Sequence, residues 1–503
     1  MKLLYDVENF GAIDADTDEL LLECFENHNA YLDLVNFKKF LIVGKKGSGK
    51  TAIYKKIMSE KEHNLFCVGH SFSDYPWHHH DKQSRIGVPN HDRFIQSWKY
   101  LILMSISKII LNNDNSVPFD DDSRESYSVI EKFIYDTYGT TKPDVSQIFL
   151  PQKKLKLKSF IDFEKGGVKI SSPFETVSMD NLPQVISEVN INLMNHMFNC
   201  LNDKNKYYVC FDELDLGFDP NDINYIDRLI GLIRASKDIN NKAKEKGKKL
   251  FVCIFLRDDI YDKLKFEDKN KITENYLSRI EWDTNRTKKT LKKLMENRFT
   301  KVLRDTEDEI ITWEDVFDET KKINGKQQKY KYILDLTFNR PRDIIKFCNI
   351  ILQEYKDRLD IADDHNTVEK IINEDIISGK INYSEYFLEE LDDEIHKHIP
   401  EYEKYLEVFK ALGVAQFTAE EFSKIYEEKR DQYDYTKNPN EVLQMLFDFS
   451  IIGCYKAGGI GGGSNYIYMY KKPKAIFDSS ARLVVHPGLV DVLGIKKHSK
   501  ESN

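Results

Sequence analysis

The sequence predicts an α/β fold with a doubly wound parallel sheet, followed by two smaller domains. Short apolar runs alternate with amphipathic helical segments in the first half of the chain, and a glycine-rich loop follows the first apolar run. Strands that alternate with helices favour a parallel sheet. The chain has 503 residues, too many for one hydrophobic core, so we expect about three domains.

Five short apolar runs predict the strands of the sheet. They cover residues 39–43, 65–69, 207–211, 250–256 and 280–282. Segments 92–111, 185–202 and 222–241 carry apolar residues at helical spacing and predict the helices between them. Ligands of such a sheet bind at the carboxyl ends of the strands, so polar motifs that follow these runs are candidate site residues.

Changes in pattern along the chain predict the domain boundaries. We expect an α/β domain over residues 1–284, a helical lid domain over 285–395, a winged-helix-like domain over 396–495 and a disordered polar tail at 496–503. Polar and acidic runs indicate an insertion at about 112–182 within the first domain.

Local patterns add detail to three of these regions. Residues 14–36 predict an acidic amphipathic helix, and alternating stretches at 154–158 and 168–170 predict one or two β-hairpins in the insertion. After residue 400, three helical segments precede two strand-like runs at 451–455 and 466–470. Three helices followed by a hairpin is the pattern of a winged helix.

Composition indicates a soluble globular protein of a reducing compartment. The chain is 41% hydrophobic and 31% charged, with a net charge of −9, so global charge does not indicate nucleic-acid binding. Its seven cysteines form no Cys-x-x-Cys pair. The N-terminus lacks the apolar core of a signal peptide, and no run approaches about 20 apolar residues. We expect a cytoplasmic protein without membrane contact.

A phosphate-binding loop follows the first predicted strand. The motif reads Gly44-Lys45-Lys46-Gly47-Ser48-Gly49-Lys50-Thr51 and leads directly into a helix. Gly44, Gly47, Ser48 and Gly49 would let backbone N–H groups approach a polyphosphate. Lys50 would contact the β- and γ-phosphates, and Thr51 would hold Mg²⁺. We therefore expect ATP and Mg²⁺ as cofactors.

Two carboxylates follow the third predicted strand. Asp212 would orient Mg²⁺ or a water bound to it, and Glu213 would polarise the attacking water. A hydrophobic run followed by Asp-Glu is weak evidence by itself, and an exposed acidic strand end is the alternative. Behind a phosphate loop, this pair predicts the second half of an NTPase site.

Arginines at two further positions are candidates to sense the nucleotide. Arg257 ends the fourth predicted strand and could bind the γ-phosphate, or it could pair with Asp258 or Asp259. Arg342 begins a helix in the predicted lid and could lean across the nucleotide, with Arg340 as the alternate residue. For both lid arginines, a salt bridge at the helix start is the alternative.

Three adjacent histidines at positions 78–80 suggest a metal site only superficially. Adjacent side chains point in different directions, and no second motif at metal-ligand spacing lies nearby. A solvated or partner-binding loop is the better interpretation. No signature of a Ser-His-Asp, Cys-His or nuclease active site is present.

Together, the phosphate loop, Asp212-Glu213-Leu214-Asp215, Arg257, Arg340-Pro341-Arg342 and the winged-helix pattern resemble the AAA+/STAND class of P-loop ATPases. The Asp-Glu-Leu-Asp quartet is similar to that of origin-recognition initiator ATPases. Arg257 departs from the polar Asn, Thr or Ser usual in AAA+ proteins and is closer to STAND and KAP-like bacterial ATPases. With Phe10-Gly11, the segment 256–261 resembles a group often associated with mobile elements and antiviral defence.

The resemblance implies an ATPase that couples its nucleotide state to homo-oligomerisation. Arginine fingers of the family act in trans, and Arg279 is a candidate, with a surface salt bridge as the alternative. Three functions remain open: a hydrolytic switch acting on DNA or a protein, a nucleic-acid-binding initiator or regulator that uses ATP structurally, and a sensor scaffold for an effector nuclease or toxin encoded by a neighbouring gene, as in antiphage defence. The winged-helix-like region offers side chains that would suit DNA phosphates, with docking of a protein as the alternative: Lys456, Lys471, Lys472 and Lys474 with Tyr466, Tyr468 and Tyr470.

Overall fold

The computed structural model describes residues 1–72, 94–149, 182–216, 222–284, 289–362, 369–396, 398–456 and 465–497. The chain forms two compact units. The sheet unit comprises Asn27–Lys45 and Lys50–Ile280, and the helical unit comprises Met1–Glu26, Lys46–Gly49 and Glu281–Asn503. The tip of the phosphate loop therefore groups with the helical unit, whereas both ends of the loop belong to the sheet unit.

A five-stranded parallel sheet forms the centre of the sheet unit. Its strands are β1 (Leu41–Gly44), β2 (Leu65–Ser71), β3 (Lys206–Asp212), β4 (Leu250–Arg257) and β5 (Leu277–Arg279), in the order β2-β3-β4-β1-β5. Gly44 pairs with Arg257 and Ser71 pairs with Asp212, so the motif-bearing strand ends share one edge. The predicted α/β fold with a phosphate loop between strand and helix is confirmed.

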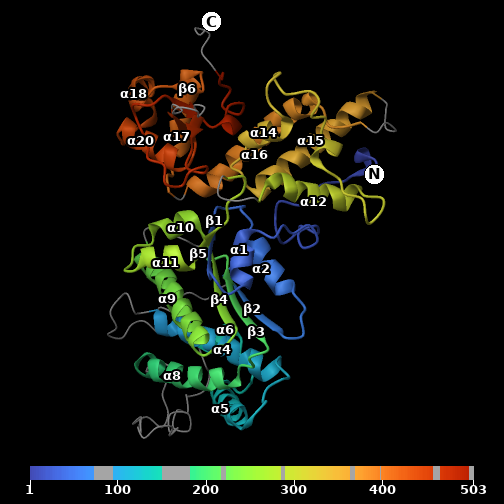
Figure 1. The fold of residues 1–503 in the computed structure, drawn as a ribbon. Coiled ribbons are helices and arrows are strands. Elements are labelled where there is room, and N and C mark those ends of the chain that lie inside the picture. The colour runs from blue at the N-terminus through green and yellow to red at the C-terminus, as the bar shows by residue number, and fades with distance from the viewer. Residues whose placement is uncertain are drawn as a thin grey trace. The chain divides into compact units, whose positions relative to one another are not determined.

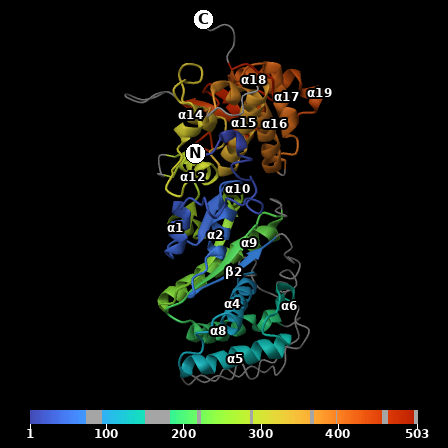
Figure 2. The same ribbon diagram turned by 90° about the vertical axis from the view of Figure 1, so that its right-hand side faces the viewer.

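Helices cover both faces of this sheet (Figure 1). They are α1 (Asn29–Val35), α2 (Lys50–Ser59), α4 (Ile95–Asn112), α5 (Asp121–Tyr138), α6 (Val145–Phe149), α8 (Leu182–Cys200), α9 (Ile223–Glu245), α10 (Asp258–Lys263) and α11 (Lys269–Tyr276). Figure 1 shows α1 and α2 on one side and α9 to α11 on the other. Helix α8 packs on α4, and α5 packs on α8 as a further layer (Figure 2).

Sequence periodicity explains the burial of β1 and α4. All four residues of β1 are buried, as expected for a central strand with helices on both faces. Helix α4 is apolar on most sides, and Trp98, Leu101 and Met104 are fully buried, because α8 and α9 both pack against it. Asp120 caps α5 by accepting a hydrogen bond from the Ser123 backbone at 2.7 Å.

In the helical unit, several α-helices follow β5 along the chain. They are α12 (Leu291–Leu303), α13 (Trp313–Val316), α14 (Lys329–Asp335), α15 (Pro341–Ala362) and α16 (Asn373–Ile395), with the 3₁₀ turn η1 (Leu4–Asp6) near the N-terminus. Helices α15 and α16 pack against each other. The N-terminal segment is joined to α12 by a buried ion pair between Asp18 and Arg298 at 2.5 Å.

The C-terminal segment contains helices followed by an antiparallel sheet. Its elements are α17 (Tyr402–Leu412), β6 (Gln416–Phe417), α18 (Ala419–Glu428), α19 (Arg430–Tyr433), α20 (Pro439–Asp448), β7 (Ile452–Lys456), β8 (Asn465–Ile467), β9 (Leu483–Val485) and η3 (Pro487–Leu489). The strand order is β6-β9-β7-β8. Helices α17, α18 and α20 with the β7–β8 hairpin follow the predicted order.

Two local predictions are wrong. Residues 14–24 form turns instead of a helix, and only α1 is helical in that region, because Asp14 and Asp18 accept backbone hydrogen bonds from Asp16 and Leu20. The fifth strand lies at 277–279, three residues before the predicted run. The described part of the insertion contains the helices α5 and α6, and its predicted hairpins lie outside the described residues.

Among the described residues, no helix combines the length and the apolar character needed to span a membrane.

Candidate active site

The phosphate loop has the backbone that its glycines predict. Gly47 and Gly49 have φ angles of 72° and 107°, a region that favours glycine. Lys50 opens α2, and its Nζ donates to the carbonyl oxygens of Gly44 and Lys45, both at 2.9 Å. The ammonium group is therefore folded back over the loop, where it is held by neutral acceptors.

The electrostatic setting of Lys50 favours a negatively charged ligand. Burial lowers the pKa of the Lys50 ammonium, and the charges of Asp215, Asp212 and Asp258 act in the opposite direction. A buried ammonium that bonds only to carbonyls would gain a charge-assisted partner from a phosphate oxygen.

Asp212 lies at the end of β3 and is 2% exposed. Burial raises its pKa to about 6, although hydrogen bonds from the Glu213 backbone and the Thr51 side chain, together with the Lys50 charge, act in the opposite direction. The Thr51 side chain thus acts on the Asp212 carboxylate, so the structure brings the two predicted metal residues together.

The donor set at this point fits Mg²⁺. Asp212 Oδ2 is buried and has no hydrogen-bond partner among the described residues. A buried carboxylate oxygen without a partner is costly unless a cation or water binds it. Mg²⁺ is commonly held by one or two protein oxygens, with phosphates and waters completing its octahedron. Thr51 and Asp212 would hold it here.

Glu213 follows the strand in a left-handed conformation, with φ of 58°. Such a conformation is uncommon for a residue other than glycine and is found at functional sites. Its Oε2 accepts a hydrogen bond from the Ser71 hydroxyl at the end of β2. The sequence analysis missed Ser71, although its position as the last residue of a strand beside β3 was a usable signal.

Arg257 is held by two carboxylates. Its Nε and Nη2 donate to Asp259 at 3.0 and 2.8 Å, and its Nη1 lies 3.5 Å from Asp215 Oδ2. The ion pair with Asp259, which the sequence left as an alternative, is present. These ion pairs hold the guanidinium at the strand end. A role of Arg257 in sensing the nucleotide remains a prediction.

The lid arginines lie in the helical unit with the loop tip. Arg340 is 2% exposed and pairs with Asp343 at 2.9 Å, with Glu394, and with the carbonyl oxygen of Lys46 at 3.1 Å. The backbone N–H of Arg342 faces the Gly47 oxygen at 3.4 Å. Arg340 is thus a buried structural cation, and Arg342 is the better placed of the two to contact a ligand of the loop.

The remaining candidates are Arg279 and the histidines at 78–80. Arg279 pairs with Asp262 at 3.4 Å, which is the alternative interpretation, and its role in trans remains a prediction. The histidines at 78–80 lie outside the described residues. Within the described ranges, no group of three His, Cys, Asp or Glu side chains could hold a metal ion.

The predicted basic surface at the C-terminal hairpin is only partly exposed. Lys456, Lys472 and Lys474 are exposed, but Lys471 pairs with Asp335 at 3.2 Å, and Tyr468 and Tyr470 are buried. Burial also lowers the pKa of the Lys471 ammonium. Lys471 and both tyrosines are therefore packing residues here.

Comparisons with known proteins relate parts of this chain to named groups. Residues 289–392, from α12 into α16, match the model of the FunZ-associated C-terminal helical domain. No curated protein matches the chain.

Similar solved structures include the following three. One is Orc1 of Aeropyrum pernix in complex with DNA, at 10% identity and a TM-score of 0.34, covering 96% of this chain and 93% of that one. A second is Cdc6p of Pyrobaculum aerophilum, at 12% identity and a TM-score of 0.29, covering 92% and 90%. The third is Drosophila ORC bound to DNA, at 10% identity and a TM-score of 0.26, covering 92% and 84%.

Because the TM-scores lie below 0.5, the activity, ligands and partners of this chain depend on the evidence of its own residues.

Proposed function

We propose that this protein binds and hydrolyses ATP with Mg²⁺ and works as a molecular switch. Its nucleotide state would control self-association and contact with DNA or a partner protein. The observation that carries the proposal is the buried Asp212 oxygen that lacks a partner among the described residues. The Thr51 side chain favours the charged form of the same carboxyl group, which supports a shared Mg²⁺ site for Thr51 and Asp212 at this edge of the sheet.

Some residues of the sheet unit would bind ATP, and others would take part in its hydrolysis. Lys50 would exchange its two carbonyl acceptors for phosphate oxygens. Bound Mg²⁺ would neutralise charge on the β- and γ-phosphates. Glu213 would orient the attacking water and accept its proton, and Ser71 would hold the Glu213 carboxylate in place until then.

The C-terminal segment would carry the signal to DNA or to a protein. Its exposed lysines, Lys456, Lys472 and Lys474, would suit phosphate contacts at the hairpin. The exposed residues of α20 include Glu441 and Asp448, which would repel a phosphate backbone. DNA contact would therefore use the hairpin rather than α20.

Substitution of Glu213 and Lys50 tests the proposal. Glu213→Gln removes the base but keeps the shape, so ATP hydrolysis should fall by at least about 100-fold while ATP still binds. Lys50→Ala should lose ATP binding itself. Phosphate release measures turnover, and titration with a fluorescent ATP analogue measures affinity.

Glu267→Gln is the matched control, because Glu267 is an exposed glutamate of the same unit. It should leave both quantities unchanged. Undiminished hydrolysis by Glu213→Gln would remove that residue from the mechanism, and unchanged affinity of Lys50→Ala would overturn ATP binding at this loop. Sedimentation of the wild type with ATP and with ADP then separates a switch from a static binder.

A further inference from the structure

Arg342 is pressed against the tip of the phosphate loop. The Arg342 backbone N–H lies 3.4 Å from the Gly47 oxygen, and a Cβ added to Gly47 would meet the Arg342 Cβ at 2.9 Å. No side chain fits between them, so glycine at position 47 is what allows Arg342 to approach. The loop tip and the start of α15 therefore form one packed surface in the helical unit.

Carboxylates of α16 form ion pairs with the cations at this surface. Arg342 Nη1 lies 3.2 Å from Glu390 Oε2, and Lys46 Nζ lies 2.6 Å from Asp393 Oδ2. Lys46 Nζ also lies 3.8 Å from Glu390 Oε2, so Glu390 serves both cations. The Glu390 side chain is only 12% exposed, so solvent screens these pairs weakly.

Two buried donors at the same place have no acceptor. Arg342 Nε and the Ser48 hydroxyl lack a hydrogen-bond partner within the described part of the chain. The Ser48 backbone, by contrast, is fixed by the indole N–H of Trp282, which donates to its carbonyl oxygen at 3.0 Å. Buried donors without partners are uncommon, and here they lie beside a phosphate-binding loop. They indicate that the surface has capacity for a further anion.

We propose that Glu390 is a positioning residue that holds Arg342 and Lys46 until the γ-phosphate of ATP displaces it. The proposal rests on ATP binding at this loop, as proposed above. A γ-phosphate carries more charge and more acceptor oxygens than a carboxylate, and it can use the donors that Glu390 leaves without a partner. Two anions cannot share the same cations without repulsion, so Glu390 lowers the affinity for ATP. ADP has no γ-phosphate and does not compete with Glu390.

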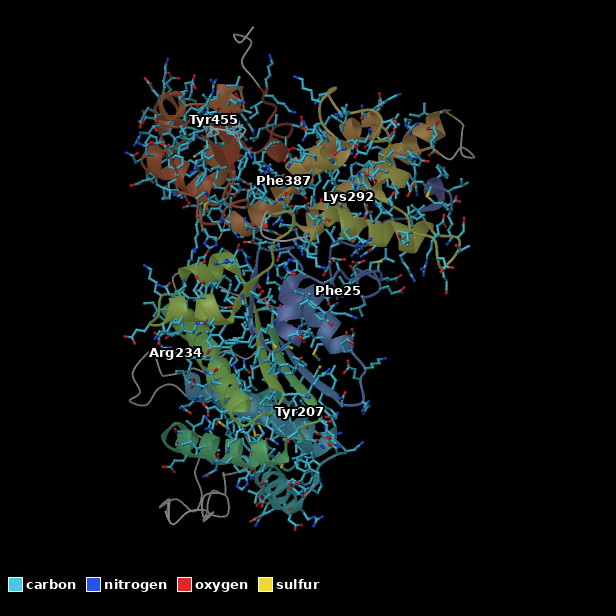
Figure 3. The ribbon with its side chains drawn as sticks, in the orientation of Figure 1. Phe25, Tyr207, Arg234, Lys292, Phe387 and Tyr455 are labelled. Atoms are coloured by element: carbon cyan, nitrogen blue, oxygen red, sulfur yellow. The ribbon has the colours of Figure 1, made fainter. Side chains whose placement is uncertain are left out.

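The same helix carries contacts to the C-terminal segment. Phe387, labelled in Figure 3, stacks on His486 with ring centroids 5.0 Å apart. The Ser384 hydroxyl donates to the Gly488 oxygen at 2.6 Å, and Lys380 pairs with Asp491 at 2.5 Å. Release of Glu390 at one end of α16 would thus change the contacts that α16 makes with residues 486–491. Through these contacts the nucleotide state would reach the C-terminal segment.

Comparison of Glu390→Gln with Glu389→Gln tests the proposal. Glu389 is the exposed neighbour on the same helix, so its substitution makes the same change in charge without touching Arg342 or Lys46. We expect Glu390→Gln to bind ATP about 5-fold more tightly and ADP with a change below about 2-fold. Glu389→Gln should match the wild type for both nucleotides.

Asp393→Asn is the second variant, because it removes a carboxylate that pairs with Lys46 and leaves the Arg342–Glu390 pair in place, and it should tighten ATP binding about 2-fold. A folding defect would weaken ATP and ADP together, so the ratio of the two affinities distinguishes competition from a structural role. If the wild type binds ATP and neither variant changes that ratio, the role of Glu390 is overturned and ATP binding stands. A wild type that binds no ATP overturns both.

Discussion

The two units bury their titratable groups in different ways. In the sheet unit, His70 is 8% exposed and contacts the Ser105 hydroxyl at 2.9 Å, and burial lowers its pKa to about 4. The imidazole is therefore buried in its neutral form. In the helical unit, Arg298 is buried as an ion with Asp18 at 2.5 Å, and Arg340 is buried with Asp343 at 2.9 Å.

This difference predicts two kinds of sensitivity. A group buried in its neutral form makes folding depend on pH, because unfolding restores its ordinary pKa. A buried ion pair contributes little net stability, but the loss of one partner leaves an uncompensated charge. The sheet unit should therefore respond to acid, and the helical unit to single substitutions.

Arg298→Met should have the largest effect. It leaves Asp18 buried without its partner and also removes the donor to the Phe10 oxygen at 2.9 Å, so the free energy of unfolding should fall by about 3 to 5 kcal/mol. Urea denaturation measures the change. The double variant Arg298→Met with Asp18→Leu should recover most of it, because no buried charge remains. A single variant within about 1 kcal/mol of the wild type would contradict the comparison.

Acidification should destabilise the sheet unit through His70. Its pKa is about 4 in the folded protein and about 6.5 when unfolded, so the unfolded chain binds the extra proton first as pH falls. The stability from neutral His70 is complete above pH 6.5 and is lost between pH 6.5 and about 4, by about 3 kcal/mol.

His70→Gln, which keeps a polar partner for Ser105, provides the control for this prediction. Denaturation by urea at several pH values between 4 and 7 should show a smaller dependence on pH in the variant. Equal slopes for the two proteins would mean that His70 is not buried in its neutral form.

Substitutions of two adjacent lysines should have the smallest effects. They distinguish an exposed cation of the helical unit from one that is held in an ion pair. If the hairpin contacts DNA, Lys472→Ala should reduce the slope of log affinity against log salt by about 1, because Lys472 is exposed. Lys471→Ala should leave that slope unchanged and lower stability, because Lys471 pairs with Asp335. Binding titrations at several salt concentrations measure the slope, and equal changes for both lysines would contradict the assignment.

Much of the fold was predictable because its signals are local. The runs before Gly44 and Asp212 are apolar enough to be buried strands, and both strands are present with the motifs at their carboxyl ends. The predicted helix at residues 14–36 failed for a local reason as well. Asp14 and Asp18 compete with the helix for backbone hydrogen bonds, and Asp18 is further fixed by Arg298 from a distant part of the chain.

The pairing of the charged residues was not predictable. Arg257 could have faced a ligand or a carboxylate, and the structure pairs it with Asp259 and Asp215. Arg340 directly precedes α15 and Arg342 lies in its first turn, yet Arg340 is a buried structural ion and Arg342 lies against the loop. Such differences depend on which elements pack against each side chain.

By itself, the sequence determined the parallel α/β fold, the phosphate loop and the carboxylates that follow the third strand, because strand burial, glycine conformation and loop position are encoded within a few adjacent residues. Only the tertiary structure decided that Ser71 holds Glu213 and that Thr51 lies beside Asp212. It also decided that Glu390 forms ion pairs with Arg342 and Lys46. These pairs join residues that lie far apart in the chain. Which partner a buried polar group finds depends on the packing around it, and no short sequence pattern contains that information.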